Sequence, residues 1–363
     1  MAQRHMLDES PRDHFASRLE MACAQDAPGI AALLAAPMPG AVQLALVPSV
    51  NSCMPRNEMA LRHHALVARG ADGNILAHGS RSVRRLWLDG KPRWVGYLGG
   101  LRRDAVLAGA GRRLAHGLAQ LALTRADDEA EHDFTAILTA NHQARRVLEG
   151  GLRGAPTYHH IGDFRTWICA SKTLASAKPP VGWSIGKLRS DEISTVQRLV
   201  DDHARNYALV VCVADAVDDW LVLRRGDQPV GCVRLWDRRE DQRVMVVRYA
   251  QVLGRLRTLA NVALRVTRRP TLPVPGTALE LGYLAHWTCP EIDPAIVCAL
   301  LAAVARLAIE RGCDSLAMGL NLKHPCASVV DAFPAWRLNS RLYAVGTRPS
   351  LSDFGPSPEV ALL

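Results

Sequence analysis

With 363 residues, 48% of them hydrophobic and 22% charged, the chain has the length and composition of a soluble globular protein of two ordinary domains. No apolar run is long enough to cross a bilayer, because Arg306 interrupts the longest one, 295–309, which is therefore predicted to form a buried helix. The formal charge of +9 indicates attraction to anions, and a phosphate-rich small molecule accounts for it as well as nucleic acid does.

The first part of the chain is predicted to hold a leader followed by alternating strands and helices. Residues 1–14 lack the apolar core of a secretory signal and predict a flexible leader. Asp26 followed by Pro28 is typical of a helix start, since an acidic residue caps the first N–H groups and proline fits the first turn. The elements predicted up to residue 101 are strands at 18–24, 64–69, 75–87 and 93–101, helices at 30–34 and 40–46, and a loop at 48–58.

The stretch 94–114 combines an apolar strand pattern, a turn at Gly109-Ala110-Gly111 and a helical pattern that begins with Arg112-Arg113. Glycines let a backbone approach a phosphate closely, and the first N–H groups of a helix attract negative charge. Guanidinium groups add forked donors for phosphate oxygens. The stretch therefore predicts an anion site, although a glycine turn before a helix with solvated arginines has the same pattern.

Further elements follow this stretch before a change in composition. A strand is predicted at 134–139, a short helix at 141–149 and a closing strand at 166–170. Residues 171–181 are short of large apolar side chains and contain two adjacent prolines, which predicts a linker.

The pattern then starts again, which predicts two copies of one α+β unit. Residues 188–193 repeat the strand, acidic cap and helix start of the N-terminal region. A hairpin is predicted at 220–225 and 230–237. Gly282-Tyr283-Leu284 matches Gly96-Tyr97-Leu98, and 314–321 matches 136–141. The shared order of these short matches indicates a tandem repeat.

The nine cysteines show neither CxxC pairs nor Cys/His spacing of a metal site. An odd number of scattered cysteines is typical of reduced, buried thiols in a cytoplasmic protein. We therefore expect a cytoplasmic location and no metal.

The segment 101–114 resembles the acyl-CoA-binding segment of the GNAT superfamily of N-acyltransferases, in which a strand leads into the turn Arg/Gln-x-x-Gly-x-Gly/Ala and a long helix. Gly109 and Gly111 fit this turn, whereas Ala108 and Arg113 depart from it. Asn141 to Ala144 resembles the Asn-x-x-Ala helix start that flanks the pantetheine arm in that family. Leu148 stands where the family often has a tyrosine that acts as general acid.

The resemblance implies an α+β fold of three layers, with two tandem GNAT-like domains that each have a mixed, twisted sheet flanked by helices. We expect a leader at 1–14, an acyl-CoA-binding domain at 15–170, a linker at 171–181, a degenerate GNAT-like domain at 182–348 and a tail at 349–363.

The resemblance also implies a coenzyme site in the first domain. The implied cofactor-binding residues are Gly99, Gly100, Leu101, Arg102, Arg103, Ala108, Gly109, Ala110, Gly111, Arg112, Arg113, Asn141 and Ala144. Gly99-Gly100 would allow a bulge and a close approach of backbone to ligand. In the second domain, residues 289–294 have no glycine and carry two carboxylates, which repel a diphosphate. We therefore expect one acyl-CoA per chain.

No general base is identified by the sequence, and the candidate catalytic residues are Tyr97, Tyr158 and His159. Two of them have an alternative interpretation. Tyr97 also fits a strand core, and the His-His pair at 159–160 also fits a loop surface. Glu58 and Cys53 are weaker candidates in a predicted loop. His63-His64 is expected on a strand surface, with a ligand role as the alternative. A solvated hairpin edge is expected for Arg81, Arg84 and Arg85, with contact to an acidic acceptor or to the CoA 3′-phosphate as the alternative.

The function that the resemblance implies is transfer of an acyl group, with acetyl as the first expectation, from acyl-CoA to an amine of an unknown acceptor. An acyl-CoA-binding protein without catalysis, a nucleic-acid-binding protein and a longer-chain acyl or aminoacyl transferase remain the alternatives. The partners expected are acyl-CoA and the acceptor, without membrane or nucleic acid, in a monomer or homodimer.

Overall fold

The computed structural model describes residues 18–37, 42–48, 61–104, 107, 111–213, 219–289, 293–349 and 355–363. The strands are β1 (Arg18–Met21), β2 (Val42–Pro48), β3 (Arg62–Arg69), β4 (Ile75–Leu88), β5 (Lys91–Arg103), β6 (His132–Leu138), β7 (Tyr158–Ala170), β8 (Trp183–Lys187), β9 (Trp220–Arg225), β10 (Gln228–Asp237), β11 (Gln242–Tyr249), β12 (Leu281–Thr288), β13 (Ser315–Asn321) and β14 (Ala335–Gly346). The α-helices are α1 (Ala27–Leu34), α2 (Gly111–Leu123), α3 (His142–Glu149), α4 (Ser171–Leu174), α5 (Ile193–Ala204), α6 (Gln251–Arg255), α7 (Arg257–Val266), α8 (Pro294–Glu310) and α9 (Ala327–Asp331).

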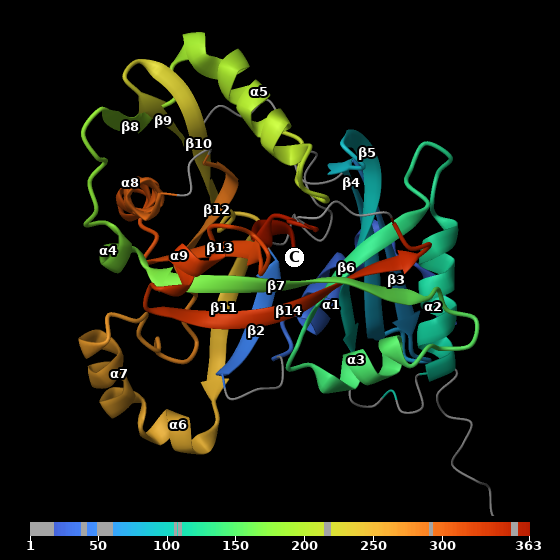
Figure 1. The fold of residues 1–363 in the computed structure, drawn as a ribbon. Coiled ribbons are helices and arrows are strands. Elements are labelled where there is room, and N and C mark those ends of the chain that lie inside the picture. The colour runs from blue at the N-terminus through green and yellow to red at the C-terminus, as the bar shows by residue number, and fades with distance from the viewer. Residues whose placement is uncertain are drawn as a thin grey trace, which may run out of the picture.

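One twelve-stranded sheet runs through the molecule in the order β1-β3-β4-β5-β6-β14-β7-β13-β12-β10-β9-β8. We call β1 to β7 the first half and β8 to β14 the second half. The halves are interleaved, because β14 lies between β6 and β7 and β7 also pairs with β13. Figure 1 shows β7 and β14 crossing the middle of the molecule. The two halves therefore cannot separate without breaking the sheet.

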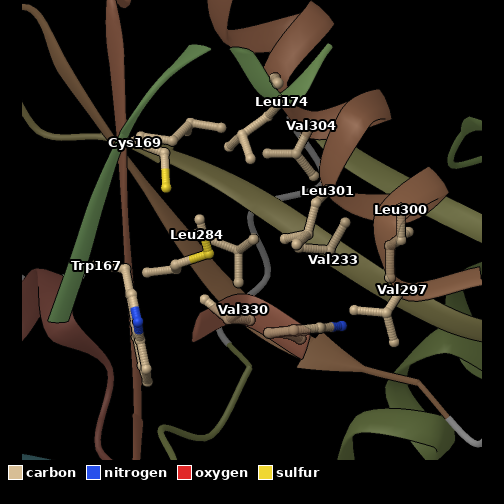
Figure 2. Close-up of a cluster of buried hydrophobic side chains, with 14 of the residues drawn as sticks. Trp167, Cys169, Leu174, Val233, Leu284, Val297, Leu300, Leu301, Val304 and Val330 are labelled. Atoms are coloured by element: carbon tan, nitrogen blue, oxygen red, sulfur yellow. The ribbon is translucent and has the colours of Figure 1, made fainter. Parts of the chain in front are cut away.

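The second half buries its sheet between two helices. Alternate side chains of β9 point to opposite faces, so Leu221 and Leu223 pack in one cluster and Trp220 and Val222 in another. The first cluster includes the apolar side of α8, which Figure 2 shows packed against strand residues such as Leu284. The other cluster contains Val196 and Val200 of α5. Residues 295–309 were predicted as a buried helix, and α8 confirms it.

The first half buries one sheet face under α2 and α3 and the other under segments from the second half. Leu121 of α2 packs with Leu66 and Leu98, and Leu148 of α3 packs in a neighbouring cluster. On the opposite face, Leu209 and Leu363 pack with residues that include Leu86, Val95 and Phe134. A core shared in this way couples the two halves further.

The hairpin predicted at 64–87 is confirmed as β3 and β4, but the helix predicted at 40–46 is wrong. Residues 42–46 belong instead to β2, which pairs antiparallel with β11 from Gln242 to Tyr249. The pairing partner lies so far along the chain that no local pattern could reveal it. The predicted strand at 166–170 begins earlier, at Tyr158, so residues 158–160 lie on β7 rather than in a loop.

Part of the predicted linker is helical, since Ser171 to Leu174 form α4 and Leu174 is buried beside α8. The predicted leader lies outside the described residues. The described end of the predicted tail, 355–363, packs against both halves, with Ala361 and Leu362 buried. The domain boundaries themselves stay predictions.

Candidate functional site

The first feature of the candidate site is the point at which β5 and β6 diverge. These strands pair in parallel at Tyr97 and Phe134, after a single bridge between Trp94 and Glu129. Beyond Tyr97, no pairing joins the described residues of β5 to β6. The backbone of β5 beyond this point is therefore open on its β6 side, and Leu101 is 42% exposed.

The second feature is a bulge in β5 at the same place. The register between β4 and β5 shifts between His78 and Ser80, opposite Gly99 to Arg102. Gly100 has a φ of 62°, a left-handed conformation that glycine adopts without strain. The bulge that the glycine pair was predicted to allow is therefore present.

Buried polar side chains hold the backbone carbonyls of this bulge. His78 Nδ1 lies 2.8 Å from the Gly100 carbonyl oxygen, and the Ser80 hydroxyl donates to the Gly99 carbonyl at 3.2 Å. The Thr135 hydroxyl of β6 donates to the Leu98 carbonyl at 2.7 Å. Burial lowers the pKa of His78, so the ring is neutral and its proton sits on Nδ1, the atom facing a carbonyl that only accepts. The bulge is thus fixed by side chains from both neighbouring strands.

Tyr97 lies directly beside the bulge. Its ring centroid is 4.9 Å from that of Phe134, and an added Cβ on Gly99 would lie 2.7 Å from Tyr97 Cε1. The Arg84 guanidinium carbon is 5.5 Å from the ring centroid. Burial raises the pKa of Tyr97 to about 12, which keeps its hydroxyl protonated at neutral pH. Tyr97 can therefore donate a hydrogen bond or a proton here, but it cannot serve as a base.

The other two candidate catalytic residues are not brought to Tyr97. Tyr158 packs with Leu98, on the sheet face opposite Tyr97, and burial raises its pKa. His159 Nε2 lies 3.1 Å from the Gly346 carbonyl oxygen of β14. The structure thus separates the three candidates, and their catalytic roles stay predictions.

The predicted coenzyme residues fall into three groups. Gly99 to Arg103 form the end of β5, where Arg102 and Arg103 bond to nearby carbonyls of Leu101 and Leu107. Gly111, Arg112 and Arg113 begin α2, while Ala108, Gly109 and Ala110 lie outside the described residues, as do Cys53 and Glu58. Asn141 caps α3, because its side-chain oxygen accepts from the Ala144 N–H at 3.1 Å. Whether these residues bind a coenzyme stays a prediction.

A buried ion network that sequence reasoning missed lies beneath the divergence. Arg81 is fully buried and pairs with Glu129 and with Asp133, whose Oδ1 is 2.8 Å from Arg81 Nη2. Arg62 and Arg125 pair with the same two carboxylates from the rim. The solvated edge predicted for Arg81 is therefore wrong. The acidic run 127–133 was the signal that could have revealed a partner for a strand arginine.

The same backbone arrangement recurs in the second half. Strands β12 and β13 pair in parallel from Leu281 to Tyr283 and then diverge. The register between β10 and β12 shifts between Cys232 and Arg234, and His286, opposite this shift, has a φ of 49°. His286 therefore occupies the position in β12 that Gly100 occupies in β5.

In the second half, however, the bulge is already occupied by the C-terminal segment 355–363. The Glu359 carboxylate accepts from the His286 backbone N–H at 2.8 Å, and the His286 ring stacks on Trp220 with centroids 5.2 Å apart. Burial raises the pKa of Glu359 to about 7 and lowers that of His286 to about 3. The remaining cavity has a volume of about 30 Å³, room for one or two water molecules and not for a coenzyme arm.

The C-terminal segment is fixed to the second half by further hydrogen bonds. The Ser357 N–H donates to the Ala208 carbonyl at 2.7 Å, and the Asn321 amide donates to the Pro356 carbonyl at 3.0 Å. Arg238 donates to the Ala361 carbonyl. Nothing in the sequence of this segment predicts that it closes the second bulge.

The described residues contain no group of three or more His, Cys, Asp or Glu side chains placed to hold a metal ion. None of their helices has the length and apolar character needed to cross a membrane.

No protein-family model matches the sequence, and no curated protein has a matching sequence. Solved structures do match the fold. A GCN5-related N-acetyltransferase from Sphaerobacter thermophilus superposes with a TM-score of 0.55 at 14% identity, over 98% of this chain and 100% of that one. Saccharomyces cerevisiae N-myristoyltransferase with bound myristoyl-CoA gives 0.54 at 12% identity, over 97% of this chain and 91% of that one. A fungal GCN5-related glucosamine N-acetyltransferase region gives 0.55 at 11% identity, over 91% of this chain and 38% of that one.

These superpositions show that the chain has the GNAT fold, which confirms the fold class that the sequence predicted.

Proposed function

We propose that this chain, which has the GNAT fold, is a CoA-dependent acyltransferase with one acyl-CoA site in its first half. The thioester end of the coenzyme would lie between the diverging ends of β5 and β6. Its diphosphate would lie at the start of α2, beside Arg112 and Arg113. The acceptor would be an amine, and acetyl is the first acyl group to test.

The observation that carries this proposal is the open backbone of β5. Beyond Tyr97, the described part of β5 has no ladder partner on one side, and its carbonyls at Leu98, Gly99 and Gly100 are already bonded to side chains. Backbone N–H groups left without a partner would pair with an amide-bearing pantetheine arm, as in strand addition. The matching backbone in the second half is covered by Glu359.

The chemistry needs few side chains. The amine nitrogen attacks the thioester carbonyl carbon, a tetrahedral oxyanion forms, and the carbon–sulfur bond breaks to release the CoA thiolate. The amine loses a proton and the thiolate gains one. Tyr97 would donate a hydrogen bond or that proton, since its raised pKa keeps it neutral.

The direct experiment is a thiol-release assay with acyl-CoAs of increasing chain length and a panel of amines. We expect acyl-CoA-dependent release of free thiol that rises with one class of amine. Gly111→Glu should abolish binding and release while leaving the fold intact, because a carboxylate at the start of α2 repels the diphosphate. Unchanged activity in that variant would place the coenzyme elsewhere.

An acyl-CoA-binding protein without catalysis is the second candidate, and one observation favours it. Tyr158 is half-buried on the face opposite Tyr97, and His159 is bonded to a backbone carbonyl, so no second acid or base stands beside Tyr97 among these candidates. Binding of acyl-CoA in calorimetry without thiol release from any amine would support this candidate over the enzyme.

A further inference from the structure

The connection between β10 and β12 is a segment without counterpart in the first half. The equivalent strands β4 and β5 are joined by the two-residue turn Asp89-Gly90. Between β10 and β12 the chain instead forms β11, α6 and α7. We call residues 242–279 the basic segment. Figure 1 shows its helices at the lower left edge of the molecule.

The basic segment carries most of the net charge of the chain. It contains seven arginines and no lysine, aspartate or glutamate, so it contributes +7 of the overall +9. Six of these arginines are exposed, and Arg257 is half-buried. In the described part of the chain, none of the seven forms a salt bridge with a carboxylate. The positive charge noted in the sequence is thus concentrated in one segment of the chain, and no described salt bridge neutralises it there.

The helices α6 and α7 have two apolar sides. Leu253, Ala260 and Leu264 pack on the cluster that contains Val246 and Tyr249. This side anchors the helices on β11 and β2. It also means that the helices do not need a further partner to be held in place.

The other side of these helices is apolar and exposed. Its members are between 48% and 78% exposed, and they are Val252, Leu256, Leu259, Val262 and Val266. Leu259, Val262 and Val266 are spaced by three or four residues along α7, which places them on one side of that helix, while Val252 lies on α6 and Leu256 between the two helices. A contiguous exposed apolar stripe marks an interaction surface, whereas single exposed apolar residues do not.

We propose that α6 and α7 form a docking surface for an anionic lipid bilayer. The aliphatic stripe would lie in the boundary between headgroups and acyl chains, and the arginines would face the lipid phosphates. Long arginine side chains reach the headgroups while their stems stay on apolar surface. The surface would hold the acyltransferase site near membrane-derived acyl donors or acceptors.

Charge complementarity and the apolar stripe together favour a bilayer over other anions. Nucleic acid satisfies the arginines, but its phosphate backbone offers no apolar surface to cover Leu259 or Val266. A bilayer needs only the stripe and the net positive charge, without a matching groove. From the sequence we expected no membrane partner, because no segment is long enough to span a bilayer, but a helix that lies on the membrane surface needs no such segment.

The test is flotation of the full chain with phosphatidylcholine vesicles, with and without about 30 mol% phosphatidylserine. We expect binding to the anionic vesicles and weaker binding at high salt. The triple variant Arg265→Gln, Arg268→Gln, Arg269→Gln should bind these vesicles about 100-fold less tightly, since each arginine near an anionic surface contributes about a fivefold factor. The triple variant Leu256→Ser, Leu259→Ser, Val266→Ser should lose about tenfold or more.

Matched controls are Val181→Ser, at a fully exposed apolar residue outside the basic segment, and Arg153→Gln, at an exposed arginine there. Both should bind like the unaltered chain. Absence of flotation with anionic vesicles would overturn the proposal. The proposal would also be overturned if only the arginine variant lost vesicle binding while duplex DNA bound the unaltered chain. The same holds if the triple serine variant changed the oligomeric state without changing vesicle binding.

Discussion

The two halves of this protein build the same strand bulge and leave it in opposite states. In β5 the bulge at Gly99-Gly100 is open on the side where β6 diverges. In β12 the bulge at His286 donates its N–H to Glu359 of the C-terminal segment. The backbone geometry alone therefore does not make a ligand site, and what occupies the bulge decides whether a ligand can enter.

The side chains that surround the two bulges also differ in chemical character. At Gly96, before the first bulge, an added Cβ would meet Asp133 and Arg81, whereas at Gly282 it would meet Leu235, Cys313 and Leu316. Around these two glycines, the first half thus has a buried ion network and the second half has apolar packing. Charged, hydrogen-bonded side chains around a site are suited to keeping its backbone fixed while one side is open.

The largest expected effect comes from breaking the ion network under the open bulge. Arg81→Met leaves Glu129 and Asp133 buried without their central cation, which should cost about 3–5 kcal/mol of unfolding free energy. Urea denaturation measures it. Arg341→Met, at an exposed pair with Glu149, is the control and should cost less than about 1 kcal/mol. Equal losses in the two variants would show that the network does not hold the first half.

The second expected effect concerns the closed bulge and pH. The pKa of Glu359 is raised from 4.5 to about 7 in the folded chain. Between these two pH values the folded chain keeps a proton on Glu359 that the unfolded chain has released. This group therefore makes stability fall as pH rises from about 4.5 to about 7, by about 3 kcal/mol at most. Glu359→Gln should remove that fall, as denaturation at about pH 5 and about pH 8 would show.

Comparison with the variant is needed because buried histidines act in the opposite direction. Burial lowers the pKa of His286 to about 3 and those of His203 and His324 to about 4, so they raise stability as pH rises toward 6.5. The difference between the two chains isolates Glu359. Identical pH profiles would mean that its carboxylate is not buried in the second bulge.

The third effect contrasts the two bulges directly through ligand binding. Gly100→Ala places a Cβ 2.9 Å from the His78 ring at a φ of 62°, so the bulge must shift. Such strain should weaken acyl-CoA binding by about 10- to 100-fold in calorimetry. His286→Ala, in the closed bulge, should leave the affinity unchanged. An equal loss in both variants would remove the distinction between the halves.

The smallest effect is expected at two asparagines, Asn141, which follows β6, and Asn321, which ends β13. Asn141→Ala removes an exposed helix cap and should cost about 1 kcal/mol in denaturation, while Asn141→Asp keeps it. Asn321→Ala should cost more, because Asn321 is buried and its amide donates to Pro356 of the C-terminal segment. The reverse order would argue against closure of the second half by that segment.

The features that sequence predicted are those set by local patterns. The alternation of apolar and polar residues predicted the hairpin of β3 and β4, and the apolar content of 295–309 predicted α8. The glycine pair Gly99-Gly100 predicted the bulge in β5. Resemblance gave the GNAT fold, which the superpositions confirm.

The features that sequence missed depend on distant partners. β2 forms because β11 pairs with it, so its helical pattern was misleading. Arg81 is buried because Glu129 and Asp133 reach it from another element. Glu359 closes the second bulge from a segment whose composition carries no signal. In each case the deciding contact lies far along the chain, beyond the reach of periodicity.

The most direct measurement is the stoichiometry of acyl-CoA binding to the full chain by isothermal titration calorimetry. We expect one acyl-CoA per chain, lost or strongly weakened in Gly100→Ala and retained in His286→Ala. Two sites per chain, or a single site that disappears in His286→Ala and persists in Gly100→Ala, would contradict an open first half and a closed second half.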